Sequence, residues 1–64
     1  MSTPATFSIA DQIACVRREI AMRERVYPKW VSAGRMKHDD AHREIAAMQA
    51  VLTTLEALRD GGAQ

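Results

Sequence analysis

The chain has 64 residues, of which 47% are hydrophobic, 27% are charged and 5% are aromatic. A chain this short buries only about 60% of its unfolded surface when it folds alone, so we expect one domain or part of an assembly. Nine Lys and Arg against eight Asp and Glu leave a net charge of +1, which argues against a strong global attraction to nucleic acid or to an anionic membrane.

Residues 1–7 combine small and polar residues with a single Phe, a composition typical of a flexible arm. They hold neither the basic n-region nor the apolar core of a secretion signal. No stretch of the chain approaches the roughly 20 apolar residues that a membrane span needs. Because Cys15 is the only cysteine and no internal disulfide can form, the sequence favours a cytoplasmic protein with no membrane contact.

A first helix is predicted to begin near Ile9. Ser8 has a side chain suited to the N-cap, and Asp11 places a carboxylate near the positive end of the helix. Phe7, just before the cap, is expected to pack on the first turn as a hydrophobic staple. Apolar residues at alternating steps of four and three then predict a seam that faces a second helix, with Arg23 in one slot: Ile9, Ile13, Val16, Ile20 and Tyr27.

A second and weaker apolar stripe follows the same helix, roughly 100° round from the seam. It consists of Cys15, Met22 and Val26. Glu19 and Arg23 lie between the two stripes and are four residues apart, a spacing at which they can pair. The helix therefore has two sides that favour contact with other helices.

Pro28 interrupts this pattern because it cannot donate a hydrogen bond to the carbonyl of Glu24. Two outcomes stay open: the helix kinks at Pro28, or it ends and a short new helix begins there. Gly34 is suited to the left-handed residue that ends a helix. We place the turn of a hairpin at residues 34–38.

The second helix is predicted to begin near His38 or Asp39 and to end at Gly61, which is suited to the C′ position just past a helix. Its start is uncertain because Lys37 and His38 stand where a Ser, Thr or Asp cap is expected. Its apolar residues repeat the four-three spacing and form a wide arc: Ala41, Ile45, Ala47, Met48, Val51, Leu52, Leu55 and Leu58.

Two helices joined by a short turn must run antiparallel. The predicted fold class is therefore all-α, an antiparallel two-helix hairpin whose first helix is kinked or broken at Pro28. The hairpin domain spans residues 8–60, and residues 61–64 form a flexible tail. Because no third helix covers the second stripes, we expect a homo-oligomeric helical bundle, most simply a dimer, whose interface uses Cys15, Met22, Val26, Val51 and Leu58.

Catalysis is not expected. His38 and His42 have the spacing of two metal ligands on one helix face, but no third His or Cys ligand has metal spacing and the glutamate of an HExxH motif is absent. Cys15 has no adjacent His or Lys to activate its thiol. A two-helix chain also lacks a concave pocket that could hold reacting groups. We predict a protein that is not an enzyme and binds neither a metal nor a cofactor.

The segment 23–31 combines two polar-tipped aromatic residues, a helix break and three cations. Aromatic rings give rigid contact area, and neighbouring cations can hold phosphate or stack on a base. The candidate residues for binding a ligand or partner are Arg23, Arg25, Tyr27, Lys29, Trp30 and Arg35. Alternatively, Tyr27 and Trp30 close the end of the bundle, and the charges near the turn are simply solvated.

Three motifs follow one another along the chain: Tyr-Pro-Lys-Trp-Val at 27–31, Gly-Arg-Met at 34–36 and Arg-Glu-Ile-Ala-Ala-Met at 43–48. With them, residues 9–58 resemble a family of short proteins encoded by tailed phages and prophages. Members share an arginine-rich first helix, Tyr-Pro-basic-Trp-Val, Gly-basic-Met and a second helix with Glu-Ile-Ala-x-Met. The resemblance implies a phage or prophage origin, and with it a location in the host cytosol. It implies less about the activity.

The leading functional hypothesis is a small accessory protein that acts by stoichiometric binding. It would antagonise a host factor, in host takeover or anti-defence, or sequester a small anionic ligand such as a nucleotide signal where the cations of several protomers converge. Its expected partners are itself and an unknown host or phage protein or small anionic ligand.

Two other classes stay open: a nucleic-acid-binding regulator and a purely structural assembly protein. Arg17, Arg18 and Arg25 on an exposed face support the regulator. Asp11 and Glu24 are expected to interrupt that face, so nucleic acid is not the favoured partner.

Overall fold

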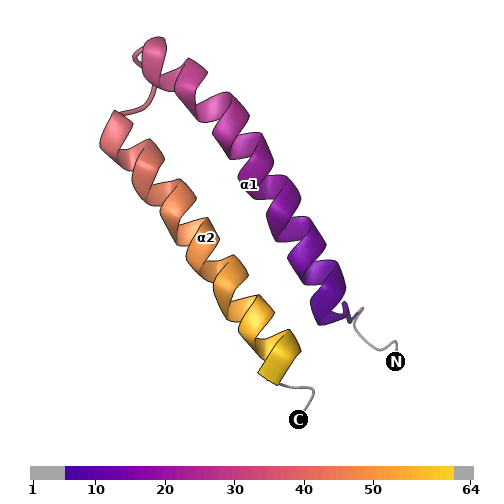
Figure 1. The fold of residues 1–64 in the computed structure, drawn as a ribbon. Helices are drawn as coiled ribbons and strands as arrows, with labels where there is room; N and C mark the ends of the chain where they lie inside the picture. Colours follow the sequence, from indigo (N-terminus) through magenta and orange to yellow (C-terminus); the bar gives the residue numbers. More distant parts are fainter. Residues whose placement is uncertain (1–5, 62–64) are drawn as a thin grey trace, which may run out of the picture.

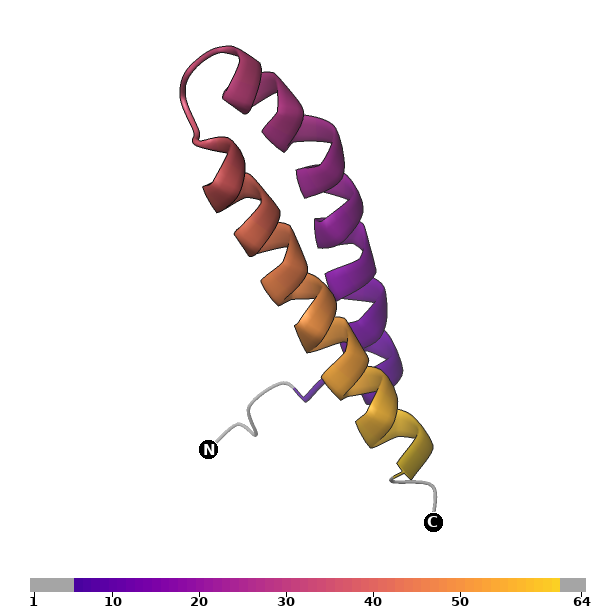
Figure 2. The ribbon, with the colours of Figure 1, turned by 60° about the vertical axis from the view of Figure 1, so that its left-hand side comes forward.

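The computed structural model describes residues 6–61 and consists of two α-helices that lie side by side (Figure 1). α1 spans Ile9–Ser32 and α2 spans His38–Gly61, and each has 24 residues. Residues 33–37 reverse the chain, and a view turned by 60° shows the helices still adjacent along their length (Figure 2). The predicted all-α hairpin is confirmed. Residues 1–5 of the predicted arm and residues 62–64 of the predicted tail lie outside the described residues.

Hydrogen bonds fix the start of α1 where the sequence predicts it. The backbone N–H of Asp11 donates to Ser8 Oγ at 3.0 Å, so Ser8 is the N-cap. The predicted staple is wrong, because Phe7 is 67% exposed. Its ring has no apolar residue at the N4 position, where Gln12 stands. Instead, the Gln12 side-chain amide donates to the Phe7 carbonyl at 3.0 Å.

Loss of the Ser8 cap is expected to destabilise the hairpin measurably. Ser8→Ala removes the acceptor of the Asp11 N–H, so we expect the free energy of unfolding to fall by about 1 kcal/mol. Urea unfolding followed by far-UV circular dichroism measures this change. The control is Ser32→Ala at the other end of α1, which is expected to change the midpoint little. Equal effects of the two substitutions would contradict the capping role.

α1 continues through Pro28 as one helix, so the alternative of a separate short helix is wrong. The helix then ends in a hydrogen-bonded C-terminal motif. The N–H of Arg35 donates to the Trp30 carbonyl at 2.9 Å, and the N–H of Gly34 donates to the Val31 carbonyl at 3.1 Å. Gly34 has a φ of 74°, as expected of a left-handed residue that ends a helix. The connection is residues 33–37, one position before the predicted turn.

The start of α2 at His38 agrees with the prediction, and its end differs by one residue. Lys37 precedes the helix, and its carbonyl accepts the N–H of Ala41 at 3.0 Å. The chain therefore starts α2 without a Ser, Thr or Asp at the position before it. Gly61 is the last helical residue, whereas the sequence predicted it just past the helix.

The core is the predicted seam between the two helices. Ile13, Ile20 and Tyr27 of α1 and Ala41 of α2 are buried, with Ile13 only 3% exposed. The remaining seam residues are half-buried: Ile9, Val16, Ile45, Met48, Leu52 and Leu55. No polar or charged residue of the described chain is buried. Each helix thus buries a single line of side chains, which leaves other apolar residues outside the core.

Candidate functional site

The second apolar stripes of the two helices lie on the same side of the hairpin. A groove of about 640 Å³ is lined by Cys15 and Val16 from α1 and by Val51 and Leu55 from α2. Helical periodicity places Met22 in line with Cys15, and Leu58 in line with Val51, because residues seven apart share one side of a helix. We call this side the apolar face, defined by Cys15, Met22, Val26, Val51 and Leu58.

Residues of the apolar face are largely open to solvent. Val51 is 45% exposed and Leu58 is 55% exposed. Cys15 is exposed as well, and Met22 and Val26 are half-buried. The five residues predicted for an oligomer interface are therefore brought onto one side by the fold, and the hairpin itself does not cover them.

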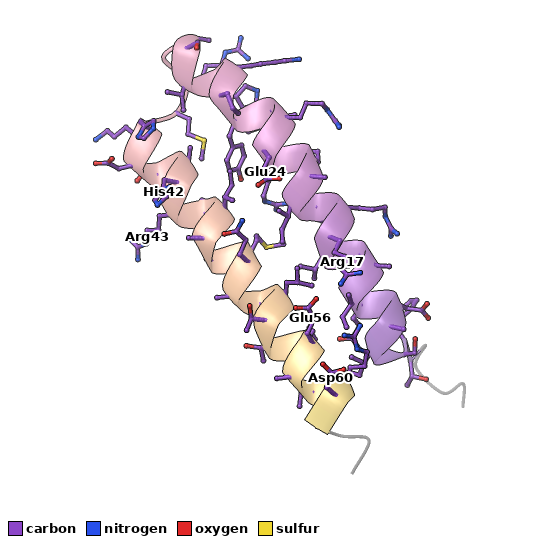
Figure 3. All side chains as sticks on the ribbon, viewed as in Figure 1. Arg17, Glu24, His42, Arg43, Glu56 and Asp60 are labelled. Carbon is purple, nitrogen blue, oxygen red and sulfur yellow. The ribbon has the colours of Figure 1, made fainter. Side chains whose placement is uncertain are left out.

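The other side of the hairpin is charged. Arg17 follows Cys15 by two positions, which turns it about 200° round the helix. Its guanidinium lies 2.9 Å from the Glu56 carboxylate of α2, and Figure 3 shows the two side chains pointing toward each other, with Glu24 and Asp60 on the same side. An exposed pair of this kind contributes at most about 1 kcal/mol. The hairpin therefore has one apolar and one charged side.

The aromatic residues of the segment 23–31 form a pair at the turn end. The ring centroids of Tyr27 and Trp30 are 5.5 Å apart and the planes are tilted by 32°. Tyr27 is 8% exposed and belongs to the seam, whereas Trp30 is 42% exposed. Of the alternative that Tyr27 and Trp30 close the end of a bundle, the hairpin shows only the burial of Tyr27 in the seam. Trp30 rests on Tyr27 and keeps a free surface.

Arg23 occupies a seam position, and its guanidinium forms an ion pair with Glu19. The Arg23 guanidinium donates to the Glu19 carboxylate at 2.7 Å and to the Glu19 carbonyl at 3.2 Å. The hydrogen bond to the carboxylate is the main cause that raises the pKa of Arg23, and Tyr27 adds to it. Nε of Arg23 is buried without a hydrogen-bond partner among the described residues. The predicted pairing with Glu19 is confirmed, which leaves Arg23 less available to a ligand.

Arg25 and Lys29 lie on a different side of α1 from the other candidate binding residues. Arg25 follows Arg23 by two positions and is turned about 200° from it, and Lys29 is one turn further on. Both side chains are exposed. Within a single chain the helix therefore separates these two cations from Tyr27 and Trp30.

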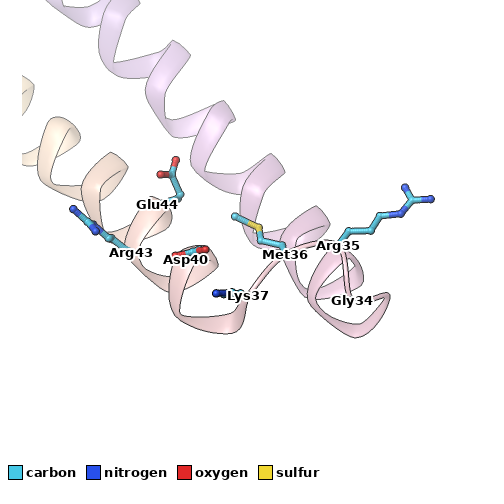
Figure 4. A pocket seen from close by; sticks show the side chains of 7 residues that line it. All are labelled: Gly34, Arg35, Met36, Lys37, Asp40, Arg43 and Glu44. Carbon is cyan, nitrogen blue, oxygen red and sulfur yellow. The ribbon is translucent and has the colours of Figure 1, made fainter.

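A hollow of about 850 Å³ lies at the turn, where Figure 4 shows the side chains that line it. Arg35 points away from both helices there, so it does not join the other candidate residues. Lys37 and Arg43 flank Asp40, and Glu44 extends toward α1. Carboxylates between the cations offset their charge, which makes this hollow a poor site for an anion.

The two histidines line a small hollow of about 390 Å³ beside Tyr27 and Pro28. The nearest carboxylate to His38 is that of Asp39, at 3.7 Å. Among residues 6–61, no group of three or more His, Cys, Asp or Glu side chains is placed to hold a metal ion.

Neither helix within the described part of the chain is long and apolar enough to cross a membrane. Comparisons of the sequence and fold with protein families, with curated proteins and with solved structures found no match. The resemblance to short phage proteins and the functions that it implies therefore stay predictions. What the fold provides is a hairpin with an apolar face, a charged side and an edge of α1 that carries cations.

Proposed function

We propose that the protein is a non-catalytic binding protein that works as a homodimer. Two hairpins would pack their apolar faces together into a four-helix bundle. The observation that supports this proposal is the position of Cys15 and Val51 on one groove, with Leu58 more than half exposed beside it. Exposed apolar side chains gathered on one side of a small protein typically mark a contact surface.

The size of the apolar face suits a dimer. Helices of 24 residues are about 36 Å long, and two helices side by side are roughly 20 Å wide. One face of the hairpin therefore offers roughly 700 Å², close to the ~800 Å² that each partner buries in a stable complex. A second copy is the simplest occupant, because a two-fold axis matches the face with itself.

Binding is favoured over catalysis by the architecture. Two helices provide open grooves along their surface, whereas reacting groups need an enclosed site with supporting side chains around it. The partner class in the phage-type hypothesis, a host factor or a small anionic signal, rests on the resemblance and on the cations near Trp30. A bend in α1 at Pro28, where a helical hydrogen bond is lost, would adapt the turn end to such a partner.

Sedimentation equilibrium of the full chain between about 1 and 500 μM tests the proposal. We expect a monomer–dimer equilibrium whose dimer fraction rises with concentration, together with helical circular dichroism at the dimer concentrations. A monomer at every concentration with full helicity would overturn the dimer. Large open-ended oligomers would instead support the structural assembly class.

A further inference from the structure

We propose that the outer edge of α1 binds the phosphate backbone of a nucleic acid, without reading its sequence. The site consists of Arg18, Arg25 and Lys29, which we call the basic edge. This inference builds on the proposal that the protein works by binding, and it names a partner for the side of α1 opposite the seam, which borders the apolar face at Arg18.

Helical geometry places the three cations in one line. Arg25 follows Arg18 by seven residues and Lys29 follows Arg25 by four, so all three lie within about 40° of one another around the helix. That line is about 180° from the seam and faces away from α2.

The cations of the basic edge are free to bind. Arg18, Arg25 and Lys29 are exposed, and within the described residues none of them takes part in an ion pair. By contrast, Arg17 is paired with Glu56, and Arg23 is paired with Glu19.

Glu24 lies beside Arg17, which belongs to the face predicted from Arg17, Arg18 and Arg25, but it does not lie on the basic edge. It precedes Arg25 by one position and is therefore turned about 100° from it, and Figure 3 shows it on the side of Arg17 and Glu56. Asp11 is in line with the basic edge, but it precedes Arg18 by seven residues, or about 10 Å along the axis. Between Arg18 and Lys29 the edge therefore carries positive charge alone.

The spacing favours a polymer of phosphates over a single small anion. Arg18 and Arg25 are about 10 Å apart along the helix, and Arg25 and Lys29 are about 6 Å apart. One phosphate cannot contact charges spread over about 16 Å, whereas a duplex carries one charge per ~1.7 Å of its axis. Each cation of the edge can then meet its own phosphate.

The residues between the cations argue against a protein partner on this edge. On the flank away from the apolar face, Ala14, Ala21 and Ser32 offer no large side chain that could anchor an interface, and Met22 on the other flank is half-buried and belongs to the apolar face. Tyr27 and Trp30 lie on another side of the helix. No amide or aromatic side chain accompanies the cations to contact base edges, so binding is expected to be independent of sequence.

Fluorescence anisotropy with labelled 20-base-pair DNA duplexes of two unrelated sequences tests the inference. We expect both duplexes to bind equally, with a dissociation constant of about 10⁻⁶–10⁻⁴ M at 100 mM salt. Three phosphate contacts per protomer predict a slope of about −2.7 in log K against log salt. Affinity should therefore fall roughly 40-fold or more between 50 and 200 mM salt.

Two double variants with the same net charge distinguish binding by the basic edge from a general effect of the protein's net charge. Arg25→Gln with Lys29→Gln is expected to weaken binding about tenfold or more and to reduce the slope by about 2. Lys37→Gln with Arg43→Gln removes the same charge elsewhere, and it should change the affinity less than about threefold. Circular dichroism and sedimentation of both variants verify that fold and self-association are retained, so failure of the dimer and failure of the basic edge are told apart.

Four results would overturn the inference. The first is no anisotropy change at 50 mM salt. Equal losses in the two double variants are the second, since they would reflect net charge alone. The third is complete competition by inorganic phosphate at the same phosphate concentration as the duplex. The fourth is tighter binding to anionic lipid vesicles than to DNA.

Discussion

Ile13→Ala is expected to unfold most of the hairpin at 25 °C. Ile13 is the most buried side chain of the seam, with 3% of its surface exposed. Truncating a buried isoleucine costs about 2–5 kcal/mol. Because a protein of this size gains only about 3–5 kcal/mol from its core, the substitution removes most of the available stability.

Far-UV circular dichroism with urea unfolding measures this loss at a fixed protein concentration, since a dimer shifts the apparent stability. Ile13→Val is the graded control and should cost about 0.5–1.5 kcal/mol. Cys15→Ala is the second control. Cys15 is two residues after Ile13 but lies outside the seam, so its truncation should lower the stability of the monomer far less. If Ile13→Ala kept a wild-type midpoint, the seam would not be the core.

The second large effect is expected at the apolar face. Val51→Glu with Leu58→Glu places two carboxylates in the proposed dimer interface, where they would be desolvated without a partner. An uncompensated buried charge costs about 3–5 kcal/mol, so the dimer should weaken by 100-fold or more. Sedimentation equilibrium measures the shift of the association constant.

Ala46→Glu with Gln49→Glu is the matched control, since both residues are exposed and lie on other sides of α2. It adds the same charge and should leave self-association within a fewfold of the wild type. The two pairs of substitutions also separate stability from assembly, because neither pair touches the buried seam. Equal weakening by both pairs would assign the effect to net charge and contradict the apolar face.

Much of the hairpin could be predicted because its determinants are local. The seam follows from the spacing of Ile13, Ile20 and Tyr27, a pattern that needs no knowledge of distant contacts. The same holds for the cap at Ser8 and the left-handed Gly34, each of which acts within one turn of chain. The features that the structure confirms depend either on the repeating spacing of apolar residues or on a single hydrogen bond between residues close in the chain.

Pro28 shows where local reasoning is insufficient. Its missing N–H favours a break, but Tyr27 just before it is buried in the seam, and the half-buried Val31 three residues after it lines the same hollow as Ala41 of α2. Packing of this end of α1 on α2 favours a continuous helix. The staple at Phe7 fails for a local reason instead, since it needs an apolar partner one turn later and Gln12 stands there.

The candidate binding residues illustrate the difference between neighbours in sequence and neighbours in space. The segment 23–31 looks like one site because its aromatic and basic residues are consecutive. A helix turns by 100° per residue, so Arg25 and Lys29 leave the side of Tyr27 and join Arg18 instead. The basic edge is visible in the sequence, because its cations are separated by seven and four residues, spacings that place them on one side of a helix like the apolar residues of the seam.

The short connection at Gly34 has a consequence for how the protein folds. Because residues 33–37 alone join the helices, the first seam contacts to form, between Tyr27 and Ala41, close a small loop. Later contacts can add pair by pair toward the chain ends. Helical proteins with such local contacts fold in microseconds to milliseconds. The slow, concentration-dependent step in forming the proposed dimer should therefore be the encounter of two finished hairpins.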